Sequence, residues 1–124
     1  MNKLRHWNDH MRRVVRQFGY RTAVGSHRLW VRGYISNIID VSGNDEPNVL
    51  RVIERLLQRP GVFVDVGANL GQTLGKVLHA DRARAYIGFE PQLAACHFVD
   101  RFIRDNDLRN AKVLPISPGS GLID

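Results

Sequence analysis

The chain has few of the features that mark secreted, membrane-spanning or metal-binding proteins. Its 124 residues contain one cysteine, Cys96, so no internal disulfide can form and a reducing compartment is favoured. There is no run of 18 apolar residues to span a membrane, and the opening MNKLRHWNDHMRR lacks the apolar segment of a secretory signal. The five histidines do not fall at metal-ligand spacing with other donors. We therefore expect a cytoplasmic protein without a metal, in which Cys96 is a small packed residue.

Acidic residues are nearly missing from the first third of the chain. Residues 1–33 hold eight Lys or Arg and a single acid, Asp9, which gives a formal charge of +7, so residues 34–124 sum to −1. In this basic segment apolar residues recur at steps of three and four, which predicts an amphipathic helix over residues 3–18. The apolar set is Leu4, Trp7, Met11, Val14 and Phe18.

The basic face of this helix has three interpretations. The favoured one is a solvated face on a helix whose apolar side docks on the domain. The others are contacts with nucleic-acid phosphates and binding to an anionic membrane surface. Because Trp7 lies on the apolar stripe and no nucleic-acid motif accompanies the helix, a nucleic-acid partner is not expected.

The next two segments have local signals of different kinds. Residues 20–43 are β-prone but broken by Gly33 and Ser36, which predicts one or two short strands. The stretch SGNDEPNVLRVIERLLQRPG predicts a helix, because Asn44 or Asp45 can cap it and a proline suits its first turn. Its expected apolar stripe is Val49, Leu50, Ile53, Leu56 and Leu57.

Further along, strand and helix patterns alternate. Short apolar segments at 62–66, 85–89 and 112–116 suit buried parallel strands. The two intervening segments have helical periodicity, and their expected inward residues are Leu70, Leu74, Val77, Leu78, Ala94, Ala95, Phe98, Phe102 and Ile103. The alternation predicts an α/β fold built from βαβ units. We divide the chain into residues 1–44, a basic helix with short strands, and residues 45–124, an α/β domain.

The stretch VFVDVGANLGQTLGKV places a glycine-rich loop directly after the first strand of this domain. A P-loop would need G-x-x-x-x-G-K-[ST], and a dinucleotide fingerprint would need G-x-G-x-x-G; neither spacing is present. What remains is an acid inside the strand followed by two glycines, Asp65, Gly67 and Gly71. A carboxylate at a strand end needs a partner, which a ligand ammonium group or the N–H groups of the loop could supply.

A second acid, Glu90, ends the next strand. Since parallel neighbours lie about 4.8 Å apart, Glu90 is expected beside the glycine loop, where its two oxygens could accept both hydroxyls of a ribose. An amino-acid end near Asp65 and a ribose at Glu90 describe S-adenosylmethionine better than a dinucleotide. The alternatives are a ligand-free turn, with Asp65 as a loop cap and Glu90 as a favourable acid at a helix entry.

VDVGANLGQT followed by IGFEP resembles the cofactor-binding half of the FkbM-type S-adenosylmethionine-dependent methyltransferases, over roughly residues 45–118. The resemblance implies a Rossmann-like class I fold with the methionine end at the glycine loop, the ribose at Glu90 and the adenine near Ser117. The candidate cofactor-binding residues are Asp65, Gly67, Ala68, Asn69, Gly71, Gln72, Glu90 and Ser117. No base for an acceptor is found outside the loop, so no catalytic residue is assigned.

The family typically methylates hydroxyl groups, often of sugars or sugar-containing products, which implies a small-molecule or glycan acceptor. Its sheet has seven strands, and this chain supplies about three, so we expect a truncated, N-terminal half of such an enzyme, inactive by itself. The alternative is a non-catalytic remnant that binds a cofactor or a partner. The outer edge of strand 62–66 would expose unpaired backbone groups. Residues 20–43 could cover this edge, or a second copy could do so by self-association.

Overall fold

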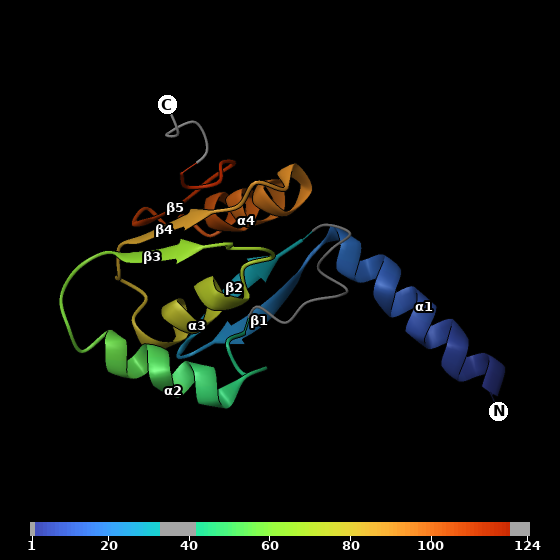
Figure 1. Ribbon diagram of the computed structural model, residues 1–124. Coiled ribbons are helices and arrows are strands. Elements are labelled where there is room, and N and C mark those ends of the chain that lie inside the picture. The colour runs from blue at the N-terminus through green and yellow to red at the C-terminus, as the bar shows by residue number, and fades with distance from the viewer. Residues whose placement is uncertain (1, 33–41, 120–124) are drawn as a thin grey trace.

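The computed structural model describes residues 2–32 and 42–119, in which helices and strands follow the alternation predicted from the sequence (Figure 1). In chain order the elements are α1 (Asn2–Phe18), β1 (Tyr20–Val24), β2 (His27–Val31), α2 (Pro47–Leu56), β3 (Phe63–Val66), α3 (Gln72–Ala80), β4 (Tyr86–Phe89), α4 (Leu93–Asp105) and β5 (Ala111–Leu114). None of the helices in these ranges has the length and apolarity needed to cross a bilayer.

Strands β3, β4 and β5 form one parallel sheet in that order, which confirms the α/β class and the three parallel strands. Asp65 pairs with Gly88, and Gly88 pairs with Val113, so the strands are in step and end together. Among the described residues no strand pairs with the outer side of β3, which therefore lies at the edge of the sheet as expected.

The two faces of this sheet differ. Helices α3 and α4 cover one face, where the rings of Phe63 and Tyr86 stack with centroids 6.1 Å apart and Val113 is buried (Figure 1). On the other face Val64 remains 55% exposed. We call this second surface the open sheet face; the strand register places on it Val64, Val66, Ile87, Phe89, Lys112 and Leu114.

Residues 20–32 form a hairpin, not isolated strands. Strands β1 and β2 pair antiparallel across a tight turn and pack on α3 and α4, on the side away from the sheet. Two polar links fix the hairpin on α4: Arg32 forms a two-pronged ion pair with Asp105, and Asn106 exchanges hydrogen bonds with the backbone of Trp30. The hairpin residues Val24, Leu29 and Val31 join the buried core. The β-prone stretch 37–41 lies outside the described residues.

Helix α2 departs from its prediction at the cap. Glu46 occupies the N-cap position without a side-chain capping bond, and Pro47 follows it. Asp45, a predicted cap, instead accepts a 2.7 Å hydrogen bond from the ammonium group of Lys76, which is 1% exposed on α3. A buried ammonium group needs a carboxylate more than a helix end does, because the helix end can bond to water.

Three predicted inward residues point outward. Val49 and Leu56 on α2, and Ala94 on α4, are exposed, whereas Leu50 and Ile53 are buried. Periodicity shows which residues share one side of a helix, but the neighbouring element decides how many of them are buried. Helix α2 packs on α3, and only part of its apolar stripe is covered.

Helix α1 forms as predicted, but its apolar side does not dock on the rest of the protein. It extends away from the body (Figure 1), and Trp7, Met11 and Phe18 are exposed. Gly19, at φ 127°, redirects the chain from α1 into β1, and an added Cβ there would collide with the ring of Trp30. The chain thus leaves the helix at one end of the hairpin, which directs α1 away from the core.

Candidate cofactor site

The glycine loop connects β3 to α3 through backbone conformations that few residues tolerate. Gly67, Asn69 and Gly71 all have positive φ, at 81°, 49° and 90°, and Gly71 is the N-cap of α3. Glycine adopts this region without steric cost, and asparagine is among the residues that tolerate it best. The loop therefore reverses direction within a few residues and presents the N-terminus of α3 at the carboxyl end of the sheet.

Backbone bonds attach the loop to the neighbouring strand. The N–H groups of Gly67 and Ala68 both donate to the carbonyl of Phe89, at 2.8 and 3.0 Å. Ala68 is buried there against Gly88, where an added Cβ would lie 3.0 Å from the Ala68 methyl group. A larger residue at position 88 would push the loop off the strand.

Glu90 lies beside the loop, as the strand spacing predicts, and both of its carboxylate oxygens accept backbone bonds. Asn69 donates at 2.7 Å from the loop, and Gln92, the N-cap residue of α4, donates at 2.9 Å. The Glu90 N–H in turn donates to the carbonyl of Leu114 at 3.0 Å. With 5% of its surface exposed, Glu90 joins the loop, the start of α4 and the end of β5. The helix-entry interpretation of this acid is thus confirmed.

Asp65 is on the helix-covered face of β3 and has a different partner. The hydroxyl of Tyr86 donates to its carboxylate at 2.6 Å. Burial raises the pKa of Asp65, the Tyr86 hydrogen bond opposes this, and the charge of Glu90 raises the pKa further. Burial and the adjacent Asp65 charge also raise the pKa of Tyr86 far above its usual range, so the phenol stays protonated.

The remaining predicted residues lie at the same end of the sheet. Gln72 is half-buried in the first turn of α3, whose first N–H groups have no partner within the helix. Ser117 is exposed, three residues beyond the last residue of β5. The structure thus brings Asp65, the loop and Glu90 together and places Ser117 farther along the same edge.

Neither carboxylate of the site, Asp65 or Glu90, forms an ion pair with a Lys or Arg in the described part of the chain. The ion pairs of Lys and Arg there go to other acids. Burial is therefore the main influence on the pKa of Asp65, which it raises, and no ion pair with a described cation opposes it. Within residues 2–32 and 42–119 no group of three His, Cys, Asp or Glu side chains could hold a metal ion.

No family model matches the chain, and no curated protein matches it.

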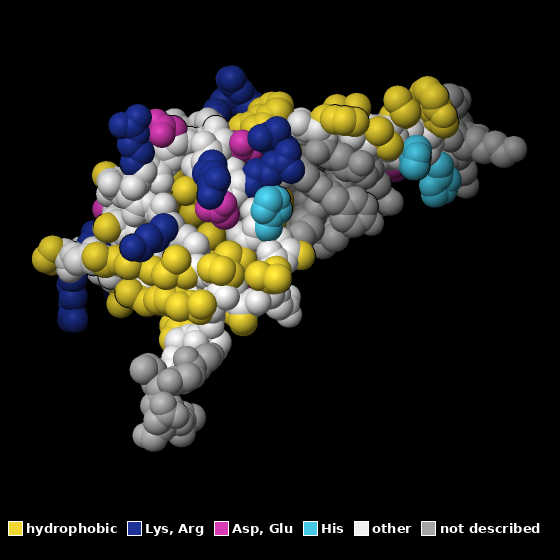
Figure 2. Space-filling model, turned by 90° about the horizontal axis from the view of Figure 1, so that it is seen from above, with side chains coloured by type: hydrophobic (Ala, Val, Ile, Leu, Met, Phe, Trp, Pro, Cys, Tyr) yellow, Lys and Arg dark blue, Asp and Glu magenta, His cyan; other side chains and the backbone are white. Residues whose placement is uncertain are grey.

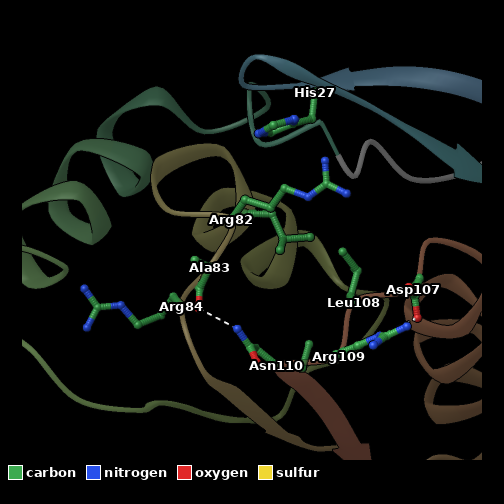
Figure 3. Close-up of a pocket in the computed structure, with 10 residues that line it drawn as sticks. His27, Arg82, Ala83, Arg84, Asp107, Leu108, Arg109 and Asn110 are labelled. Atoms are coloured by element: carbon green, nitrogen blue, oxygen red, sulfur yellow. Dashed lines mark hydrogen bonds and ion pairs between the residues drawn. The ribbon is translucent and has the colours of Figure 1, made fainter.

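A cavity of about 460 Å³ opens at the opposite end of the sheet (Figure 3). Three of its polar side chains have partners: Arg109 pairs with Asp107, and Asn110 donates to the carbonyl of Ala83 at 2.9 Å. Arg84 turns away from the cavity toward the carbonyls that end α2. None of the five cavities measured among the described residues is lined by the glycine loop or Glu90. At the site itself the loop lies closed against the strand end, where the Asn69 N–H donates to Glu90 at 2.7 Å.

Two residues of the site were not singled out from the sequence, Tyr86 and Gly88. A glycine inside a strand often marks a close approach of another backbone, and here it makes room for Ala68 and for the Tyr86 hydroxyl, 3.0 Å from an added Cβ. Gly88 in the sequence of β4 could therefore have indicated that the loop packs closely on this strand. The bond from Tyr86 to Asp65 has no sequence signal, since it depends on the register of β3 against β4.

Proposed function

We propose that this chain binds S-adenosylmethionine as the cofactor-binding half of a Rossmann-like methyltransferase of the FkbM type. The observation that carries the proposal is the pair of carboxylates, Asp65 and Glu90, at the ends of adjacent parallel strands. They flank a positive-φ glycine loop and lack a cationic partner among the described residues. In open α/β sheets ligands bind at this end of the strands.

Each residue of the site has a defined task in this proposal. Asp65 attracts the ammonium group, and Gly67, Ala68, Asn69, Gly71 and Gln72 leave space and N–H groups for the methionine end. The carboxylate of Glu90 accepts two backbone bonds and has further lone pairs that ribose hydroxyls can use. Because Glu90 is nearly covered, Asn69 must move aside before the hydroxyls can reach it. Ser117 borders the adenine.

The cofactor, when bound, supplies an activated methyl group on sulfur, and the protein's part is mainly alignment of an acceptor. The proposed acceptor is a hydroxyl of a sugar or of a sugar-containing product. No described side chain is assigned as its base. The acceptor side of the site would be formed by strands beyond the three described.

Titration calorimetry with S-adenosylhomocysteine tests the proposal without an acceptor. Because Asp65 must lose its proton to attract the ammonium group, and its pKa is raised, affinity should increase as pH rises through that pKa. Asp65→Asn should weaken binding about ten-fold or more and remove this pH dependence. Asp100→Asn, a carboxylate paired with Arg104 on the outside of α4, is the matched control and should bind like the wild type. Equal affinity for all three proteins, or no binding by a folded wild-type chain, would exclude the proposed site.

A second candidate is a non-catalytic module that associates with itself, and the open sheet face favours it. Val64 on that face is 55% exposed, and Val52 on α2, at 57%, is a control residue of the same type and nearly the same exposure. If the open sheet face or the edge of β3 mediates association, Val64→Glu should reduce a concentration-dependent dimer in analytical ultracentrifugation while Val52→Glu leaves it unchanged. A monomer at all accessible concentrations would remove this candidate.

A further inference from the structure

Helix α1 is both basic and amphipathic in sequence. Its sequence contains five Lys or Arg and one acid, Asp9, a net charge of +4. Its apolar residues Leu4, Trp7, Met11, Val14, Val15 and Phe18 fall within an arc of about 100° at 3.6 residues per turn.

The structure leaves four of these apolar side chains in solvent. Trp7, Met11, Val15 and Phe18 are all exposed, Phe18 to 78%. Hydrophobic side chains follow one another along the projecting helix in Figure 2, which lies clear of the sheet and of α2 to α4. A contiguous row of large apolar side chains on a cationic helix indicates a binding surface, because exposed single residues are common but exposed rows are not.

We propose that α1 binds an anionic lipid surface, lying in the plane of the interface with its apolar stripe among the lipid headgroups. Helices of this kind combine a narrow apolar face containing Trp or Phe with a polar face rich in Lys and Arg, and have low overall hydrophobicity. Anionic lipids attract each basic residue, while the apolar face enters the boundary between headgroups and acyl chains. Both surfaces of α1 are then occupied at once.

Charge selects this occupant over two others. A second copy of α1 would bring another net +4 beside the first, which repels. Nucleic-acid phosphates would satisfy the basic residues but leave the apolar stripe in water. The excess charge of the chain is confined to residues 1–33, so the attraction acts where the stripe is.

The first test is flotation of the full chain with vesicles of phosphatidylcholine alone and of phosphatidylcholine containing about 30% phosphatidylglycerol. Binding should be at least about ten-fold tighter to the anionic vesicles at about 0.1 M salt, and this preference should shrink at about 0.5 M salt. Equal binding to both vesicles, or binding to neither, would overturn the proposal.

Two pairs of exposed residues then separate the stripe from the charge. Val15→Asp on α1 should weaken vesicle binding about ten-fold or more, whereas Val52→Asp, at nearly the same exposure on α2, should change it less than about two-fold. Arg12→Glu should weaken it about 25-fold, at about five-fold per unit of charge, and Arg51→Glu on α2 should not. Because all four sites are exposed, circular dichroism should show the wild-type fold.

Competing partners give different results with the same variants. A nucleic-acid surface predicts tight binding of a DNA duplex that Val15→Asp leaves intact, without vesicle binding. A helix-mediated dimer predicts a concentration-dependent mass that Val15→Asp abolishes, again without vesicle binding. Either pattern, or equal effects of Val15→Asp and Val52→Asp, would overturn the proposal.

Discussion

Replacing Glu90 by glutamine tests whether this acid holds the glycine loop. Its carboxylate accepts N–H groups from Asn69 at 2.7 Å and from Gln92 at 2.9 Å, and only 5% of its surface is exposed. An amide has one acceptor oxygen, so Glu90→Gln keeps one of these bonds and turns an NH₂ group toward the other N–H.

The magnitude follows from these contacts. A hydrogen bond to a charged group is worth about 1.5–3 kcal/mol, and the bond that remains is weaker without the charge. Together these losses give a destabilisation of about 3 kcal/mol, a large share of the roughly 5–15 kcal/mol that stabilises a typical domain. At an m-value of about 1.5 kcal/mol/M, the urea midpoint should fall by about 2 M.

The assay is urea unfolding followed by circular dichroism, with Asp100→Asn as the control. Asp100 is also an acid that becomes an amide, but it is 36% exposed and pairs at 3.0 Å with the exposed Arg104. A pair of this kind contributes about 0.5 kcal/mol or less. Both variants lose one negative charge. If their free energies of unfolding differ by less than about 0.5 kcal/mol, Glu90 does not hold the loop.

Three further predictions concern single contacts. Asp45→Ala should cost about 2 kcal/mol because the buried ammonium group of Lys76 loses its 2.7 Å partner and keeps only Glu46, at 3.7 Å. Lys76→Met should cost under about 1 kcal/mol because both carboxylates can hydrate, and equal costs in urea unfolding would contradict this. Gly71→Ala should cost about 1–2 kcal/mol from its φ of 90° alone, since the added methyl group meets only Val99 at 3.5 Å; a neutral result in the same assay would show that the loop relaxes. The pKa of Asp65 is raised above 3.8, so the folded chain binds more protons than the unfolded chain: the penalty for its charge is absent below pH 3.8 and complete above the folded pKa. The thermal midpoint should therefore fall less with rising pH in Asp65→Asn than in the wild type, and a steeper fall in the variant would refute the sign.

Much of the secondary structure could be predicted because the signals are local. The period of apolar residues predicts α1 and the helices of the α/β domain, and short β-branched runs predict β3 to β5. Gly67 and Gly71, which carry positive φ, were recognisable in the glycine loop, since no other residue adopts that conformation without cost. Even the approach of Glu90 to the loop follows from the sequence, because parallel strands that start in step also end side by side.

The partners of individual side chains could not be predicted in the same way. Asp45 looks like a helix cap in sequence, and only the packing of α2 on α3 shows that Lys76 is buried and needs its carboxylate. The hydrogen bond from Tyr86 to Asp65 likewise depends on strand register.

The sequence by itself therefore determined the class of the fold, the glycine loop and the uneven charge, which depend on neighbouring residues or on composition. The tertiary structure alone decided which apolar surfaces are covered: α1 extends into solvent, and one face of the sheet stays open. The physical reason is that periodicity reports which residues share a side of an element, whereas burial depends on a second element that is distant along the chain.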